Sequence, residues 1–191
     1  MSALRERARG ERAHDLPAGL GDGVVPRGFR RYRITSELGA GIACFDAASL
    51  ALRSWQIHRD SGLAVSAEGP PSAGSTVALA VGLRLGYAAF CRRVLDHVRT
   101  ETRHAFSYQT MPGHPERGVE RFEVEIANDG CVTFATTSPS QMASPLSRIA
   151  GPLAWKLQRR ATARYHRAAK ASVEACGDMS EYVGERSIGV T

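Results

Sequence analysis

The stretch VERFEVEIANDGCVTFATTS, residues 119–138, decides the fold class. Its first half alternates apolar and polar side chains, so Phe122, Val124 and Ile126 share one face while charged residues occupy the other. The Asn-Asp-Gly run at 128–130 is a strong hairpin-turn signal, and CVTFATTS is the strand that returns from it. We therefore expect an antiparallel hairpin with one face turned toward a core.

Further strands precede this hairpin with no helix between them. Strand signals cover residues 62–69, 75–86, 87–98 and 102–110, and an earlier one covers 29–38. In the strand at 75–86, period two places on one face Val77, Leu79, Val81, Leu83 and Leu85.

Two segments have helical periodicity. In residues 41–55, helical spacing joins Ile42, Phe45, Ala48, Leu52 and Trp55, and this helix is expected to end between Trp55 and His58. A second helix is expected to begin near Pro152, because proline is favoured in a first turn, and to run to about residue 176. Its apolar stripe comprises Leu157, Ala161, Tyr165 and Ala168.

The order of strand, helix, about six antiparallel strands and long helix is an α+β pattern. A curved antiparallel sheet of six to seven strands that grips the long C-terminal helix buries both apolar faces most simply. We expect this single domain to span residues 29–176. A flexible or loosely docked N-terminal arm at 1–28 and a polar C-terminal tail at 177–191 would flank it.

Composition limits the classes of partner. The net charge of +6 comes almost entirely from arginine, and we interpret it as a coding bias, with an anionic partner as the alternative. No aromatic-plus-basic stripe or known motif favours specific nucleic-acid binding. The chain has no signal-like or membrane-spanning apolar run, and its four cysteines form no C-x-x-C pair. These features predict a cytoplasmic protein with reduced thiols, no membrane span and no zinc site.

Three motifs carry a resemblance to a known family. They are a W-x-x-H at Trp55 and His58, a Y-x-T-x-x-G-H-P-E loop at 108–116, and a G-P-x-x-x-x-x-Q-x-R-x-x-x-R-Y segment at 151–165. Over roughly residues 17–170 the chain resembles the bacterial and plant family catalogued as domain of unknown function nineteen-ninety.

The resemblance implies a helix-grip fold. That superfamily includes lipid-transfer START domains, birch-pollen-allergen-like proteins and polyketide aromatase/cyclases, which hold a hydrophobic ligand in an internal cavity between sheet and helix. The chain departs from the family pattern at Val119 and Glu120, where paired acids are usual. It departs again at 140–145, where an S-R-P and a Trp are usual. These departures change the rim of the pocket that the resemblance implies, and they are compatible with a different ligand.

The loop TMPGHPERG, residues 110–118, is the first candidate site. Pro112 and Pro115 restrict its backbone, so His114 and Glu116 are held rigidly, as a catalytic or recognition group requires. Alternatively, these two side chains only satisfy backbone groups of the loop or bond to each other.

The preceding strand supplies the second candidate. Period two places His104, Phe106, Tyr108 and Thr110 on one face, which suggests an amphipathic cavity wall, with a solvent-facing surface as the alternative. Glu120 is expected to point inward beside Phe122, as an acid/base of raised pKa or as the structural partner of an arginine such as Arg93 or Arg148.

Two functional hypotheses follow. No nucleotide-binding, serine-hydrolase or zinc-protease motif is present, so any chemistry would be cofactor-free and metal-free proton transfer. The favoured hypothesis is an enzyme of polyketide-like specialised metabolism that promotes cyclisation, isomerisation or dehydration of a bulky hydrophobic substrate. The alternative is a non-catalytic hydrophobic ligand or lipid carrier. An acyl-carrier protein could meet the arginines of the last helix, and the oligomeric state stays open.

Residues are assigned to these roles as follows. The candidate catalytic residues are His114, Glu116, Glu120 and Tyr108. The candidate substrate-binding residues are Trp55, His58, His104, Phe106, Thr110, Phe122 and Arg148. Trp55 is also interpreted as a core residue, and His58 as a cap or supporting group rather than an acid/base.

Overall fold

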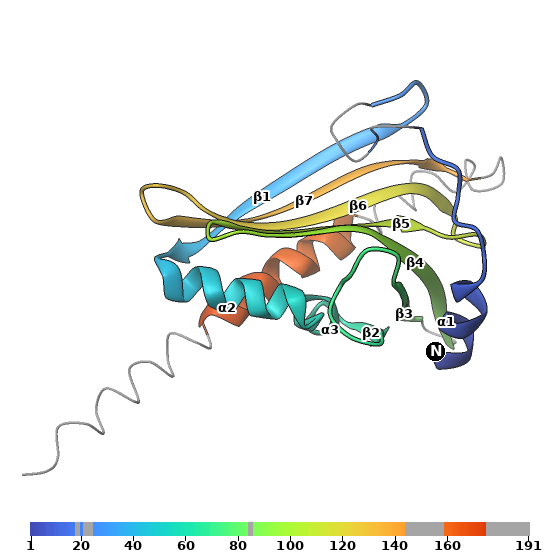
Figure 1. Cartoon of the computed structure of the whole chain (residues 1–191), viewed down its shortest axis with the longest axis horizontal. Helices are drawn as coiled ribbons and strands as arrows, with labels where there is room; N and C mark the ends of the chain where they lie inside the picture. Colours follow the sequence, from blue (N-terminus) through green and yellow to red (C-terminus); the bar gives the residue numbers. More distant parts are fainter. Residues whose placement is uncertain (18–19, 21–24, 84–85, 144–158, 175–191) are drawn as a thin grey trace, which may run out of the picture.

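The computed structural model describes residues 1–17, 20, 25–83, 86–143 and 159–174 (Figure 1). Its described strands form one seven-stranded antiparallel sheet with the order β1-β7-β6-β5-β4-β3-β2. The strands are β1 (Arg30–Ala40), β2 (Leu63–Ser66), β3 (Thr76–Leu83), β4 (Gly86–Arg99), β5 (Arg103–Thr110), β6 (Glu116–Ile126) and β7 (Cys131–Met142). From β2 to β7, consecutive strands pair with each other, while β1 pairs with β7. The expected α+β class and strand number are confirmed.

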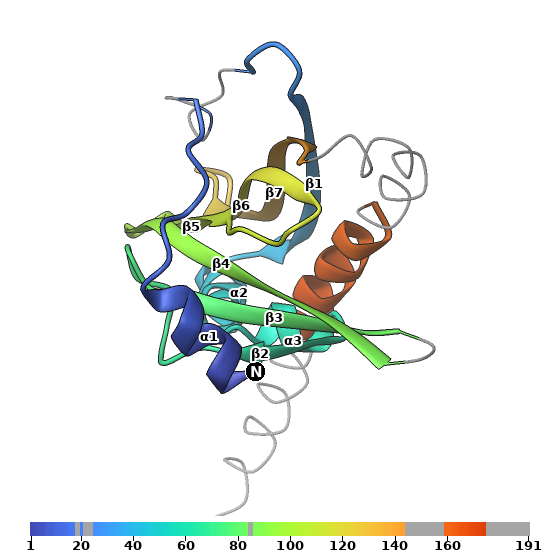
Figure 2. The same ribbon diagram turned by 90° about the vertical axis from the view of Figure 1, so that its right-hand side faces the viewer.

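Helices cover the concave face of this sheet. α2 (Ile42–Arg53), α3 (Gln56–Asp60) and a closing helix described over 159–174 lie on it (Figure 1). A view turned by 90° shows the sheet curving around the closing helix (Figure 2). Within the described residues, no helix is long and apolar enough to cross a membrane.

The closing helix packs through the stripe expected from the sequence. Tyr165 and Ala168 are buried in the main core, and the Tyr165 ring lies 5.2 Å from the Phe122 ring. Ala161 is only partly buried. Leu157 and the expected start at Pro152 lie outside the described residues.

The inner faces of the strands follow period two from the 119–138 hairpin outward. Cross-strand pairing places Phe122 opposite Phe106 and Val124 opposite Phe134, and all four are fully buried. Burying each of these side chains contributes about 1.5–3 kcal/mol. The hairpin therefore anchors the core.

α2 meets the sheet through most of the expected residues. Phe45, Ala48 and Leu52 are buried, but Ile42 is 60% exposed. The expectation for Ile42 is wrong because α2 starts beside the β6–β7 turn, where the Gly41 amide donates to the Gly130 carbonyl at 2.8 Å. The first turn of the helix thus stands at the end of the sheet.

The N-terminal segment contains a helix with no signal in the sequence, α1 (Ser2–Arg9). α1 packs on the outer face of β3 and β4, where Ala8 forms a small cluster with Ala78, Cys91 and Met111. Arg93 holds its C-terminal end by donating to the carbonyls of Ala8, Arg9 and Glu11 at 2.9–3.2 Å. Residues 2–9 are therefore docked, while the domain boundary at residue 28 stays a prediction.

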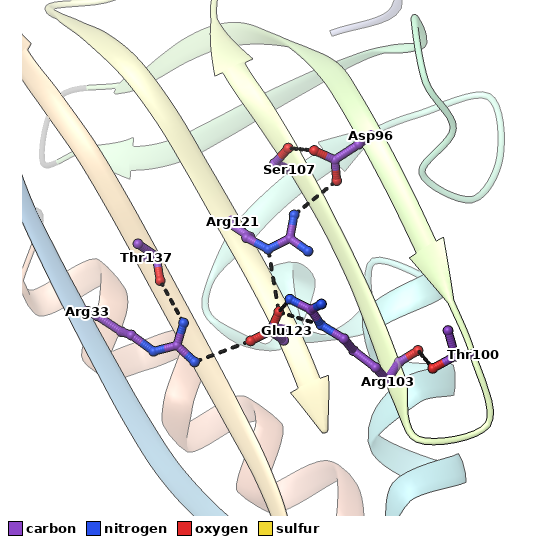
Figure 3. A network of polar contacts seen from close by, with 8 residues as sticks. All are labelled: Arg33, Asp96, Thr100, Arg103, Ser107, Arg121, Glu123 and Thr137. Atoms are coloured by element: carbon purple, nitrogen blue, oxygen red, sulfur yellow. Dashed lines mark hydrogen bonds and ion pairs between the residues drawn. The ribbon is translucent and has the colours of Figure 1, made fainter. Parts of the chain in front are cut away.

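A polar network covers the outer face of the sheet centre (Figure 3). Glu123 lies on this face as the alternation predicts, yet it is only 5% exposed. Arg33 donates to it at 3.2 Å, Arg103 donates to it from a neighbouring strand, and Arg121 lies 3.5 Å away. The network joins β1, β5 and β6 through one carboxylate.

Candidate functional site

A tight turn at residues 111–114 joins β5 to β6. The His114 amide donates to the Met111 carbonyl at 3.2 Å, Pro112 occupies the second position, and Gly113 has φ 86°. Proline second and a left-handed glycine third are the sequence requirements of a type II turn. The stiff loop expected from the sequence is therefore a four-residue turn, and it holds His114 against the inner face of the sheet.

His114 is held from both ring nitrogens. Arg92 Nη2 lies 2.6 Å from His114 Nε2, and Nδ1 lies 2.9 Å from the Glu116 carbonyl. Because a guanidinium can only donate, Nε2 accepts, and a neutral ring then carries its hydrogen on Nδ1 and donates to the Glu116 carbonyl. The Glu116 amide also lies 3.0 Å from Nδ1, but it cannot donate to a protonated nitrogen. Burial and the Arg92 charge lower the pKa of His114 well below its ordinary value. His114 is therefore a neutral imidazole whose free lone pair is already used.

Tyr108 and Glu120 form the central contact of the site. They stand opposite each other on β5 and β6, and the Tyr108 hydroxyl donates to Glu120 Oε2 at 2.9 Å. Burial raises the pKa of Glu120, while the Arg92 charge and the Tyr108 hydrogen bond oppose that rise. Burial and the Glu120 charge raise the pKa of Tyr108 well above its ordinary value. The pair is a phenol that keeps its proton beside a carboxylate that binds protons more readily than usual.

Glu116 adds a second carboxyl group to the same face. Burial and the charge of Glu120 raise its pKa to about 7, although Arg92 pulls the pKa the other way. A carboxyl group that titrates near neutral pH can both give and take a proton there. The expected inward orientation of Glu120 is observed, and Glu116 joins it two positions before Gly118.

Arg92, which was not among the expected site residues, completes the site. It pairs with Thr110 on β5, its guanidinium carbon lies 5.7 Å from the Tyr108 ring centroid, and its charge acts on both glutamates. Arg93, which we considered as a partner of Glu120, faces the opposite side and binds α1. Adjacent strand residues point to opposite faces, so counting back in twos from buried Val94 could have identified Arg92. Arg148, the other arginine considered, lies outside the described residues.

Comparison with known proteins assigns the family. Residues 15–168 match the family described as Domain of unknown function (DUF1990). The chain belongs to the DUF1990 family. A "UPF0548 protein" from Deinococcus radiodurans is 39% identical over 157 residues, which cover 76% of this chain and 79% of that protein.

Solved structures resemble this DUF1990 chain in fold. Ara h 8.0201 has a TM-score of 0.54 at 11% identity and covers 78% of this chain and 99% of its own. A START superfamily protein from Mycobacterium smegmatis has a TM-score of 0.55 at 15% identity, over 78% and 99%. The di-domain ARO/CYC StfQ from the steffimycin biosynthetic pathway has a TM-score of 0.53 at 12% identity, over 78% and 52%. The helix-grip architecture expected from the resemblance is confirmed.

The DUF1990 motifs meet in space although they are far apart in the sequence. His58 from α3 is fully buried, and its ring lies 6.0 Å from the Tyr108 ring and 5.1 Å from the Tyr165 ring. Burial, with the charges of Arg92 and Arg59, lowers the pKa of His58 to about 3. His58 Nε2 lies 3.5 Å from the Tyr108 hydroxyl, while Nδ1 has no partner among the described residues. His58 is therefore a neutral supporting group behind Tyr108.

Trp55 sets the position of His58. Trp55 has φ 62°, which turns the chain from α2 into α3, and its indole donates to the Gly69 carbonyl at 2.9 Å. Holding a bulky residue in the left-handed region costs on the order of 1–3 kcal/mol. The ring is 2% exposed and packs against Phe106 and His58, and these contacts oppose that cost.

The remaining candidates separate into three places. Phe106 and Phe122 stack with ring centroids 5.3 Å apart in the main core. Thr110 accepts from the Gly118 amide at 3.1 Å and so supports the start of β6. His104 lies four residues along β5 from Tyr108, about 13 Å away, and contacts His97 Nε2 at 2.9 Å. The structure thus groups Tyr108, Glu116 and Glu120 with His114, and it leaves His104 apart. The described residues contain no cluster of three or more potential metal ligands.

Proposed function

We propose that this DUF1990 chain is a cofactor-independent enzyme that binds a bulky hydrophobic substrate between the sheet and the closing helix. It promotes cyclisation, isomerisation or dehydration by moving protons, and polyketide-like molecules are the expected substrate class. One observation carries the proposal. The Tyr108 hydroxyl donates to Glu120 at 2.9 Å, and Glu116, with its pKa raised to about 7, lies close enough for the two carboxylate charges to act on each other.

Each group has a chemical task in this proposal. Glu116 takes a proton from carbon or returns one to the product, because its pKa lies near the working pH. Tyr108 has one hydroxyl hydrogen, which it donates to Glu120 in the free protein and turns toward the developing oxyanion once substrate is bound; Glu120 orients the phenol until then. His114 positions Arg92 rather than transferring a proton, since its Nε2 lone pair is engaged. Docking of an acyl-carrier protein on the closing helix stays a prediction.

Proton exchange tests this function without knowledge of the natural substrate. 2-Tetralone is an apolar bicyclic ketone whose α-hydrogens exchange with D₂O, and mass spectrometry follows the exchange. We expect the protein to accelerate exchange, and Glu116→Gln to reduce the acceleration by a factor of about 10²–10⁴. Tyr108→Phe should cost less, because the ring stays and one hydrogen bond is lost. Glu125→Gln, an exposed residue on the outer face of the same strand, is the matched control.

The same assay separates the carrier alternative. The buried aromatic rings around His58 favour binding of an apolar molecule whether or not chemistry follows. If the ketone binds but exchanges at the buffer rate with wild-type protein and with every variant, the enzyme is excluded and the carrier is supported. If the ketone and other apolar ligands do not bind at all, both fail.

A further inference from the structure

Arg92 is the one inward-facing cation among the described groups that form the site, and its placement suggests what kind of ligand the site accepts. It lies on β4 between Val77 of β3 and Thr110 of β5, in the row of residues on the inner face of the sheet. Val77 and Val94, its apolar neighbours, are each 1% exposed. A guanidinium is charged at every physiological pH, so this apolar row carries a permanent positive charge.

The protein uses only part of the hydrogen-bonding capacity of Arg92. Nη2 donates to His114 Nε2 at 2.6 Å, and Nη1 donates to the Cys91 carbonyl at 3.3 Å. Both acceptors are neutral, and the guanidinium carbon lies over the Tyr108 ring at 5.7 Å from its centroid. A guanidinium has five N–H donors, so these two bonds leave donors for a further acceptor.

Within the described part of the chain, no direct ion pair neutralises this charge. Among the residues that the structure describes, Arg92 is absent from the ion pairs, whereas Arg33, Arg103 and Arg121 all pair with Glu123 on the outer face. Glu116 and Glu120 are near enough to feel the charge, but both hold protons more tightly than ordinary carboxyl groups. Within the described residues, the guanidinium therefore acts on these carboxyl groups through space and not through a direct ion pair.

We propose that Arg92 is the anchor for the anionic oxygen group of a hydrophobic ligand, a carboxylate or an equivalent oxyanion, with the apolar body lying toward the closing helix. The hydrogen bond to His114 and the contact with the Tyr108 ring hold the guanidinium in place before the ligand arrives. The inference rests on the proposed function only in placing a hydrophobic ligand on this face of the sheet.

The arrangement has a consequence for protons. A ligand anion beside Arg92 weakens the influence of that cation on Glu116 and Glu120, and it adds a negative charge near both. Both effects favour the protonated carboxyl groups, so binding should take up protons from solution. Uptake should be largest near pH 7 to 8, because Glu116 is then partly or mostly ionised in the free protein.

Isothermal titration calorimetry with matched probes tests the proposal. The probes are dodecanoic acid against dodecanol and methyl dodecanoate, and 2-naphthoic acid against 2-naphthalenemethanol. We expect each acid to bind at least about tenfold more tightly than its neutral partners, as a charge-assisted hydrogen bond predicts. Paired buffers of different ionisation enthalpy should show net proton uptake for the acids alone. Whichever acid binds more tightly distinguishes a flexible lipid-like body from a fused-ring body.

Variants complete the test. Arg92→Met should remove the preference for acids while neutral probes still bind, and Arg92→Lys should restore part of it, because the charge returns without the fork. Arg99→Met, an exposed arginine at the other end of β4, is the matched control and should bind like wild type. Thermal melting confirms that each variant is folded, and if Arg92→Met is unfolded the Arg92→Lys result decides.

Equal binding of acids and neutral probes by the wild-type protein would overturn the assignment of Arg92 and leave the proposed function intact. So would a full acid preference in folded Arg92→Met or, if that variant is unfolded, an undiminished preference in Arg92→Lys. Tight acid binding without any exchange of 2-tetralone would support Arg92 as the anchor and exclude the proposed enzyme function. Failure of every probe to bind would exclude both proposals.

Discussion

At the scale of single residues, the charge of Arg92 influences the protonation of several acids and bases in the site. The Arg92 charge acts on the pKa values of His58, His114, Glu116 and Glu120, which come from three different elements. Removing that charge should therefore change several titrations at once, whereas removing one hydrogen bond should change one.

Carbon-13 NMR of the glutamate carboxyl groups can measure this. We expect Glu116 to titrate near pH 7 in the wild-type protein. Arg92→Met should raise the pKa values of both Glu116 and Glu120, because a nearby cation favours the ionised form. Tyr108→Phe should raise that of Glu120, since the hydrogen bond to its carboxylate is lost. A Glu116 titration near pH 4.5 in wild type would contradict this description of the site.

The sequence revealed these residues unevenly, for physical reasons. Tyr108 and Glu120 follow from period two, because both lie in regular strands next to well-marked apolar residues. Arg92 was missed because it is adjacent to Arg93 in a chain where arginine is common, and only the alternation counted back from Val94 separates the two. The tautomer of His114 depends on a contact from another strand, which no local pattern contains.

At the scale of elements, Gly118 controls how β6 meets its neighbours. A Cβ atom at this position would lie 2.4 Å from the Pro139 carbonyl oxygen and 2.7 Å from the Ser140 Cβ atom. Both neighbours belong to the paired strand β7, so neither can move without disturbing the ladder beside Glu116 and Glu120.

Gly118→Ala should therefore lower the free energy of unfolding by about 2–3 kcal/mol and the melting temperature by at least about 4 °C. Gly82→Ala in β3 is the matched control, because a Cβ atom there meets nothing within 4 Å. Its effect should stay within about 0.5 kcal/mol. Calorimetry of both variants checks the difference, and equal melting temperatures would show that the β6–β7 contact is not tight.

The elements themselves were mostly predictable, and the exceptions share one cause. The hairpin, the run of strands along the chain and the two longer helices follow from local periodicity and turn residues. α1 does not, because only Ala8 of its residues is buried and its support comes from Arg93 and Glu68, which are distant in sequence. The β4–β5 register shifts between Val94 and Asp96, so a strict count in twos misplaces every residue of β4 beyond it.

At the scale of the whole molecule, two glutamates on opposite faces make stability depend on pH in opposite directions. Burial alone would raise the pKa of Glu123, but the hydrogen bonds and charges of its arginines outweigh that and lower it. Its contribution is thus present above the unfolded pKa, near 4.5, and is lost as pH falls. Glu116 has a raised pKa, so its contribution is lost as pH rises through about 7.

We expect the free energy of unfolding, measured with urea, to be largest near about pH 4.5 to 5 and to fall as the pH rises toward about 7. Glu116→Gln should remove about 1 kcal/mol of the decrease between pH 6 and 8, and Glu123→Gln should weaken the decrease on the acid side. Glu125→Gln should leave the shape of the curve unchanged. Stability that rises steadily from pH 6 to 8 in the wild-type protein would contradict the raised pKa of Glu116.

The pairing of β1 with β7 has a consequence for synthesis on the ribosome. β2 to β7 can add to the sheet one after another as they leave the exit tunnel, but the partner of β1 emerges roughly a hundred residues after it. At about 5–20 residues per second, the apolar side chains of β1 wait on the order of 5–20 s without their strand partner. During that interval Ile34 and Leu38 are available to a chaperone. β1 gains its strand partner only when β7 has been synthesised.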